Sequence, residues 1–124
     1  DYDFLLVDFH GEITSEKAAM GHFFDGNATL LVGTHTHVPT NDARLLKGGT
    51  AYQTDAGMCG DYDSVIGMNK DNSINRFLKK KSTKHFPAVG EASLCGVIVE
   101  CDVETGLAKN IENFIYGGEL KNSH

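Results

Sequence analysis

The sequence lacks any hydrophobic run close to the roughly 20 residues that a helix needs to cross a bilayer, so no membrane-spanning segment is predicted. It also lacks a basic excess. Its formal net charge of −6 argues against a general nucleic-acid binder, because such proteins normally present a basic face. The three cysteines, Cys59, Cys95 and Cys101, form an odd set without C-x-x-C spacing. They indicate neither a disulfide framework nor a zinc ribbon, and they favour a reducing cytoplasm.

The length and composition are those of one small globular domain. A chain of 124 residues can form its own core, and 40% hydrophobic with 23% charged residues is near the average for soluble domains. No internal repeat, linker or low-complexity segment divides the chain. We therefore expect a single domain.

Two histidines directly follow an apolar, strand-like run. The run is 28–32, and it continues as Gly33-Thr34-His35-Thr36-His37. Side chains two residues apart on an extended backbone share a face, so both imidazoles can reach one point beyond the strand. Neutral imidazole is the commonest protein ligand for zinc, iron and similar metals. The alternative is two exposed loop histidines, and the pair on its own favours that alternative.

A second apolar run, 3–9, also ends in a histidine, His10. With a helix expected over 15–25, the two runs form a strand-helix-strand unit, which brings all three histidines to one sheet edge. Ligand sites gather beyond the carboxyl ends of such strands. Asp8 shares a face with His10 and is a metal ligand, a carboxylate that orients an imidazole, or a strand-end residue. Three histidines alone would suit a mononuclear zinc site with an open position.

The remaining pattern is a mixture of helix, strand and turn. In the helix over 15–25, Ala19, Met20, Phe23 and Phe24 form an apolar stripe suited to packing on a sheet. The lysines at 79–81 and 84 are either a phosphate-attracting patch or the solvated end of a helix, and we favour the latter. His124 lies in a polar tail that we expect to be disordered. After a long loop through 41–49, we expect a strand at 50–54, a glycine-rich turn at 55–60 and irregular structure at 61–68. A helix is expected at 70–81, and a hairpin is formed by 90–101 and 107–115 around a turn at 102–106.

Three segments carry a family resemblance that covers nearly the whole chain in order. They are Val7–Lys17 (VDFHGEITSEK), Val32–Thr40 (VGTHTHVPT) and Thr50–Met58 (TAYQTDAGM). Together they resemble the second half of the bacterial YmdB-like metallophosphoesterases, within the calcineurin-like phosphoesterase superfamily. The resemblance implies an α/β layered fold, a β-sandwich flanked by helices, of which this chain supplies the second half.

The resemblance also implies a dinuclear centre with two metal ions, iron or manganese, with zinc as a further candidate. His10 and His35 would hold one ion, and His37 the other. The implied activity is hydrolysis of phosphodiesters, in particular 2′,3′-cyclic or 3′,5′-cyclic nucleotides, with water as the nucleophile. Two cations close together would clamp the phosphoryl oxygens and would dominate the local field despite the acidic chain.

The family's other metal ligands and its proton donor lie upstream of the matching segments. We therefore expect residues 1–124 to be the carboxyl-terminal half of one metallophosphoesterase domain, whose partner is the missing amino-terminal half. No catalytic residue is assigned in this half, because the general acid is expected in the other one, and the chain alone should be inactive. A homo-oligomer is a further possible assembly.

Five residues near the histidines are candidates for the substrate pocket. Glu12 either orients a metal-bound water or histidine, or supports the first turn of the following helix. Thr34 and Thr36 either bind a phosphate oxygen or satisfy loop backbone. Asp55 is a site residue or a structural one, and Gly57 lies in a turn whose amides could approach an anion.

Two other function classes stay open on the sequence. One is a mononuclear metal hydrolase or oxygenase built on the same histidines, which as an oxygenase would need a carboxylate to complete a facial triad. The other is a non-catalytic or degenerate module that binds a metal or a nucleotide without cleaving it. Metal content per chain separates these classes from the dinuclear enzyme.

Overall fold

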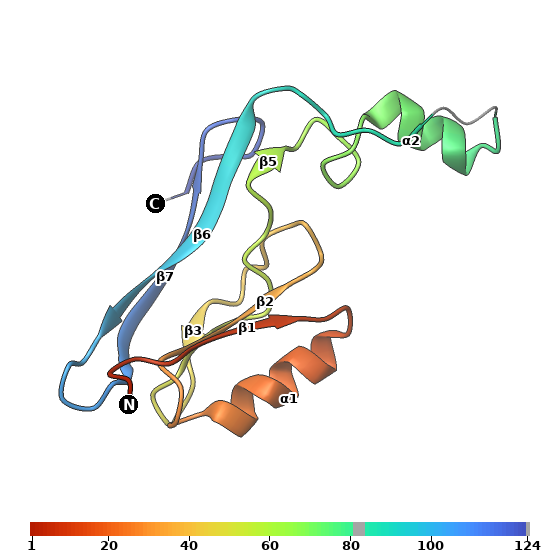
Figure 1. Ribbon diagram of the computed structural model, residues 1–124. Helices are drawn as coiled ribbons and strands as arrows, with labels where there is room; N and C mark the ends of the chain where they lie inside the picture. Colours follow the sequence, from red (N-terminus) through yellow and green to blue (C-terminus); the bar gives the residue numbers. More distant parts are fainter. Residues whose placement is uncertain (81–83, 124) are drawn as a thin grey trace.

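The computed structural model describes residues 1–80 and 84–123 and shows two β-sheets with a helix against one of them (Figure 1). Lys81 and His124, for which predictions were made above, lie outside the described residues. The elements in chain order are β1 (Leu6–His10), α1 (Thr14–Phe24), β2 (Leu30–Thr34), β3 (Arg44–Leu45), β4 (Ala51–Gln53), β5 (Gly60–Asp61), α2 (Lys70–Phe77), β6 (Ala92–Cys101) and β7 (Ala108–Tyr116).

The first sheet has the strand order β1-β2-β4-β3, with β1, β2 and β4 parallel and β3 antiparallel to β4. Helix α1 connects β1 to β2, so the predicted strand-helix-strand unit is confirmed. The register pairs Leu6 with Leu30 and His10 with Thr34. The carboxyl ends of β1 and β2 therefore lie level with each other, which places His10 beside the segment that carries the other two histidines.

The second sheet is antiparallel, in the order β5-β6-β7, and consists mainly of the long β6-β7 hairpin. Asp102 closes the hairpin turn, since its carbonyl oxygen accepts from the Gly106 amide at 2.8 Å and its carboxylate accepts from the Glu104 amide at 2.8 Å. The predicted hairpin is confirmed, including its turn at 102–106.

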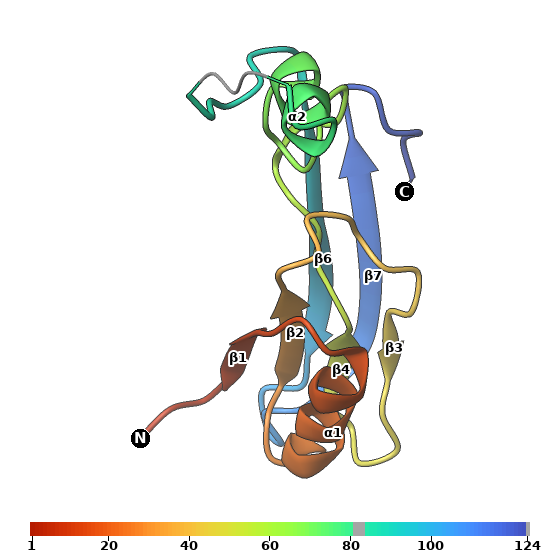
Figure 2. The ribbon, with the colours of Figure 1, turned by 90° about the vertical axis from the view of Figure 1, so that its right-hand side faces the viewer.

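The core lies on both faces of the first sheet. Strand β2 is buried along nearly its whole length, as a central strand covered on both sides should be. Leu30 and Val32 pack toward the hairpin, whereas Leu31 packs with Tyr52 toward α1. Hairpin, sheet and helix thus form three layers, which Figures 1 and 2 show from two directions. The expected layered α/β fold is confirmed.

The face that α1 turns to the sheet differs from the predicted stripe. Met20 and Phe24 pack against the core, but Phe23 is 75% exposed. The buried positions are instead Lys17 and Gly21, four residues apart on the helix. A Cβ on Gly21 would lie 2.6 Å from the ring of Tyr52, so only glycine allows the helix to approach this closely. The prediction was correct for Met20 and Phe24 and wrong for Ala19 and Phe23, both of which are exposed, because the helix is rotated to bury a lysine, which an apolar pattern cannot show.

Helix α2 lies on an arm, residues 62–80 and 84–88, that projects away from α1 (Figure 1). The predicted helix over 70–81 is too long: α2 ends at Phe77, and Lys79 adopts a left-handed φ of 54° that ends any helical run. Lys79 and Lys80 therefore follow the helix as exposed residues and do not belong to its last turn. Neither helix in residues 1–80 and 84–123 combines the length and apolar character needed to cross a membrane.

Two very short strands were missed. Strand β3 lies in the segment between residues 41 and 49, which the sequence presented as a long loop, and β5 lies where a turn and irregular structure were expected. Each is two residues long and pairs with an edge of a longer strand. Two residues are too few to produce a periodic pattern in a sequence.

Candidate metal centre

His10 is the last residue of β1 and is exposed on the same strand face as Asp8. Its Nδ1 lies 3.1 Å from the hydroxyl oxygen of Thr34, which donates to the Asp8 carboxylate at 3.1 Å. A short chain of polar groups therefore holds the Nδ1 side of the imidazole. Such contacts orient a ring and leave its other nitrogen available to a ligand. Of the roles considered for Asp8, this arrangement fits the orienting carboxylate.

His35 faces His10 directly. Its Nδ1 lies 3.2 Å from Nε2 of His10, and the two rings are nearly perpendicular at 79°. Two nitrogens that each lie about 2.1 Å from one ion, at tetrahedral or right angles, are roughly 3.0 to 3.4 Å apart. The observed separation is inside that range. The distance between the two nitrogens is therefore compatible with a shared metal ion, and it also suits a hydrogen bond between the two rings.

His37 is held apart from this pair. Its Nδ1 donates to the carbonyl oxygen of Ile66 at 2.8 Å, which leaves Nε2 as the free nitrogen. A ring N–H bound to a backbone carbonyl is the usual arrangement behind a metal-ligating histidine. His37 comes from the loop after β2, and Ile66 from the start of the arm, so this hydrogen bond joins two segments far apart in the sequence.

The backbone does not follow the extended conformation that the sequence suggested. Strand β2 ends at Thr34, and His35 and His37 have φ values of 137° and 63°. Ile66, which accepts from His37, has a φ of 50°. Non-glycine residues rarely adopt such values, and they cluster at functional sites where the surroundings impose them. The two histidines therefore do not share one strand face: one ring turns to His10 and the other to the arm.

The three histidines line one open depression of about 330 Å³. In the part of the chain that the structure describes, no three histidine, cysteine, aspartate or glutamate side chains converge closely enough to hold an ion by themselves. Two of the three imidazoles face each other, and the third is held by a different contact. Full coordination of either ion would need ligands beyond these three.

A buried ion pair fixes the loop that carries His35 and His37. The ammonium of Lys17 lies 2.9 Å from the Asp55 carboxylate, and both side chains are only 1% exposed. The same carboxylate accepts from the backbone amide of Thr36 at 2.9 Å and from that of Gly57 at 2.9 Å. Asp55 thus ties α1, the histidine loop and the turn after β4 to one point.

The charge of Asp55 is stabilised in place. Burial alone would raise the pKa of this carboxyl, but hydrogen bonds from the Thr36 and Gly57 amides and from Lys17 outweigh it, so the pKa is lowered. Asp55 is therefore ionised whenever the protein is near neutral pH. A buried carboxylate with this many donors acts as a fixed anchor for the loop.

Close backbone packing completes the anchor. A Cβ on Gly33 would lie 1.8 Å from the carbonyl oxygen of Thr54 and 3.0 Å from the Lys17 side chain. Only glycine fits at the point where the chain leaves β2 for the histidine loop. The glycine of the G-T-H-T-H string therefore serves the packing that positions the two imidazoles.

The structure sorts the five pocket candidates. Thr34 lines the depression and contacts His10, and Gly57 also lines it. Asp55 is buried behind the loop, and the Thr36 hydroxyl donates to the Val38 carbonyl at 2.8 Å, so neither side chain faces the depression. Glu12 is exposed in the loop before α1 and is not among the lining residues.

The turn at 55–60 could be a plain strand-to-loop turn, which the sequence alone favours, or one whose amides approach an anion, and its hydrogen bonds support the plain turn. The Ala56 amide donates to the Gly33 carbonyl, the Gly57 amide to Asp55, and the Met58 amide to the Tyr62 hydroxyl at 3.0 Å. These three amides already serve internal acceptors and are not free to bind a phosphate. The turn closes the first sheet and contributes walls to the depression.

Comparison with known proteins identifies the family. The model of the YmdB-like protein family matches residues 1–114. The chain belongs to this family. Among curated proteins, it is 45% identical over 112 residues to the 2′,3′-cyclic-nucleotide 2′-phosphodiesterase of Bacillus subtilis strain 168, a match that covers 90% of the chain and 42% of that protein.

Solved structures of family relatives share the fold. A phosphatase from Mycoplasma pneumoniae superposes with a TM-score of 0.86 at 44% identity, and the match covers 94% of the chain and 42% of the relative. A hypothetical protein from Thermus thermophilus gives a TM-score of 0.85 at 40% identity, with 94% of the chain and 45% of the relative covered. The YmdB-like chain thus spans less than half the length of the relatives that it matches.

The sequence analysis did not identify Lys17, whose buried ion pair with Asp55 holds the histidine loop in place. Lys17 was part of the resembling string Val7–Lys17, but a lysine on an amphipathic helix is normally solvated. The available signal for the burial of Lys17 was its position four residues before Gly21, because residues four apart lie on the same face of a helix. Its partner Asp55 lies 38 residues further along the chain, which no local pattern reveals.

Proposed function

We propose that the complete protein is a metal-dependent phosphodiesterase that hydrolyses cyclic nucleotides through a dinuclear metal centre. The observation that carries this proposal is the 3.2 Å separation of His10 Nε2 and His35 Nδ1 beside a separately anchored His37. One pair of imidazoles and one single imidazole at the same depression suit two ions. Iron or manganese is the proposed metal, with zinc as the alternative.

In this proposal, residues 1–124 bind the metal ions and orient the imidazole rings that hold them. His10 and His35 would hold one ion and His37 the other, while Thr34 and the Ile66 carbonyl fix the rings of His10 and His37. A bound pair of such cations neutralises phosphoryl oxygens and activates water as the nucleophile. The remaining ligands and the proton donor for the leaving oxygen are proposed to come from the rest of the complete protein.

The proposed substrate is based on the name of a curated relative. The Bacillus subtilis protein is named a 2′,3′-cyclic-nucleotide 2′-phosphodiesterase, and 45% identity supports related chemistry in this chain. We propose 2′,3′-cyclic nucleotides as the preferred substrates and 3′,5′-cyclic nucleotides as the second class to assay. Residues 1–124 alone are proposed to be inactive.

The test compares two histidine variants of the complete protein. His35→Ala removes one of the facing imidazoles and is expected to lower kcat/KM on a 2′,3′-cyclic nucleotide by a factor of about 100 or more, as loss of metal-based charge neutralisation should. His22→Ala changes an exposed histidine on α1 and is the matched control, expected to stay within about twofold. Hydrolysis that survives His35→Ala with unchanged metal content would refute the proposal.

A further inference from the structure

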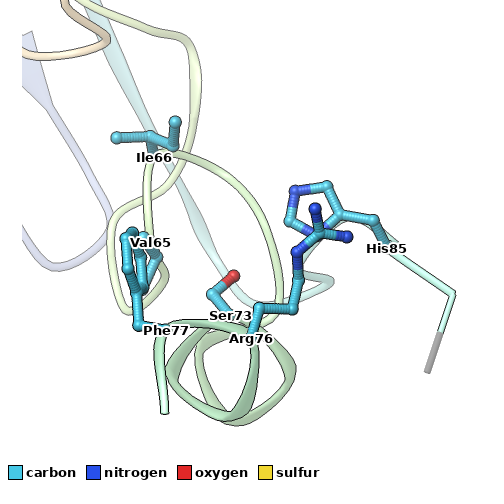
Figure 3. A pocket seen from close by; sticks show the side chains of 6 residues that line it. All are labelled: Val65, Ile66, Ser73, Arg76, Phe77 and His85. Atoms are coloured by element: carbon cyan, nitrogen blue, oxygen red, sulfur yellow. The ribbon is translucent and has the colours of Figure 1, made fainter. Parts of the chain in front are cut away.

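A second cavity lies next to the metal depression, between the loop at the start of the arm and α2. It measures about 360 Å³, within the range of small-molecule sites. Figure 3 shows that Val65 and Phe77 form one side, Arg76 and His85 extend along the other, and the Ser73 hydroxyl points into the space between them. The cavity therefore offers an apolar wall and a polar edge.

Ser73 provides an unsatisfied group inside this cavity. The residue is 3% exposed, and its hydroxyl oxygen has no hydrogen-bond partner among the described residues. A buried hydroxyl without a partner is destabilising, and native proteins rarely keep one that nothing uses. A ligand with a polar edge would satisfy it.

Arg76 is the second polar group at this cavity. Within residues 1–80 and 84–123, Arg44 and Lys70 each form an ion pair with an aspartate, whereas the structure shows no such pair for Arg76. Its guanidinium lies over the cavity beside His85, whose ring contacts Asn72 at 3.4 Å. A guanidinium presents five donors in a fork that matches two adjacent acceptor atoms.

The cavity adjoins the candidate metal centre at Ile66. This residue lines both spaces, and its carbonyl oxygen accepts the hydrogen bond from His37. A ligand with its phosphoryl group at the histidines would have to extend past Ile66 to reach Phe77 and Arg76. A phosphoryl group joined to a planar ring has this shape.

We propose that this cavity is the subsite for the nucleobase of the substrate, an inference that rests on the proposed phosphodiesterase function. The flat faces of a base would pack against Val65 and Phe77, and acceptor atoms on its edge would pair with Arg76 and Ser73. A purely aliphatic group would leave both polar side chains unpaired. Free phosphate would leave the apolar wall unused. Guanine is the best match, because its O6 and N7 are adjacent acceptors that arginine binds in pairs.

The experiment uses two substrates of the manganese-loaded complete protein. One is guanosine 2′,3′-cyclic phosphate, and the other is bis(p-nitrophenyl) phosphate, which has no nucleobase. Arg76→Ala should raise KM for the nucleotide about tenfold, because the loss of a hydrogen bond from a charged donor weakens binding by about that factor. The same variant should leave kcat/KM for the second substrate within about twofold. Ser73→Ala should act in the same direction with a smaller effect. Lys80→Ala, an exposed cation that does not line the cavity, is the matched control and should change neither.

Two results would overturn the subsite. One is an Arg76→Ala variant that loses activity equally on both substrates, and the other is a variant that keeps its KM for the nucleotide. If the unmodified protein cleaves neither substrate, the proposed function fails, and the subsite is then judged by titrating guanosine into the metal-free protein. Guanosine binding that Arg76→Ala weakens about tenfold would support the subsite, and absence of binding would overturn it.

Discussion

The two segments that meet at His37 are held in opposite ways. The histidine loop is anchored by Lys17 and Asp55, which lie 2.9 Å apart and are each 1% exposed. The arm carries its own ion pair, Lys70 with Asp63 at 2.6 Å, but these side chains are 48% and 59% exposed. The pairs have similar distances and differ in burial. Exposed pairs contribute little to stability, whereas removing one partner of a buried pair leaves an uncompensated charge inside the protein.

The candidate site therefore draws on two segments whose ion pairs differ in burial. His10 and His35 belong to the first sheet and its anchored loop, and Asp55 holds that loop through the Thr36 amide. The ring of His37 and the proposed base cavity depend instead on Ile66, in the arm.

The largest effect is expected when the buried pair is broken. Lys17→Ala leaves Asp55 buried and unpaired, and it should lower the free energy of unfolding of the complete protein by about 3–5 kcal/mol. Urea denaturation followed by circular dichroism measures this change. Because Asp55, which accepts from the Thr36 amide, loses its Lys17 partner, amide hydrogen exchange at residues 34–37 of the metal-free variant should also become faster under conditions where the protein stays folded.

A double variant separates charge from space-filling in this pair. Lys17→Met combined with Asp55→Asn removes both charges, keeps side chains of similar size and should recover a large part of the lost stability. If the double variant is as unstable as the sum of the two single variants, the pair is not the coupled anchor described above.

An intermediate effect is expected on acidification. The folded-state pKa of Asp55 is lowered, so its stabilising contribution is complete above the ordinary aspartate pKa of about 3.9 and is lost as pH falls through the folded value below it. Asp42, whose pKa is lowered by hydrogen bonds from Thr40 and Thr54 that outweigh its burial, acts with the same sign. Unfolding at pH 6 and at successively lower pH should show a loss that is smaller in Asp55→Asn. Equal pH dependence in both proteins would contradict an ionised anchor.

The smallest effect is expected in the exposed pair of the arm. Lys70→Ala removes the ammonium that contacts Asp63 at 2.6 Å, yet the melting temperature should stay within experimental error, because water solvates both charges. Differential scanning calorimetry at low and high salt is the measurement. A loss comparable to that of Lys17→Ala would erase the contrast between the two segments.

The sequence predicted the framework of the site well because its signals were local. The apolar runs that lead into His10 and His35 predicted two parallel strands connected by a helix. The pairing of His10 with Thr34 confirms that β1 and β2 end side by side. The hairpin was predicted from its turn at 102–106. Helix, strand and turn patterns of this kind are properties of a few neighbouring residues.

What the sequence did not predict depends on contacts between distant residues. Lys17 meets Asp55 across 38 positions, and His37 meets Ile66 across 29. The left-handed backbone at His37 accompanies that tertiary contact, and a residue other than glycine seldom adopts it without such support. Spacing therefore put three histidines at one edge correctly, but it could not divide them into a facing pair and a separate ring.

We propose that His10 and His35 hold one metal ion and His37 another. The metal content of the complete protein and of its His37→Ala variant, determined by mass spectrometry after loading with iron or manganese, tests this division. We expect two ions per chain, falling to one in the variant while His10 and His35 keep theirs. One ion in the unmodified protein, or two retained in His37→Ala, would refute the proposed division.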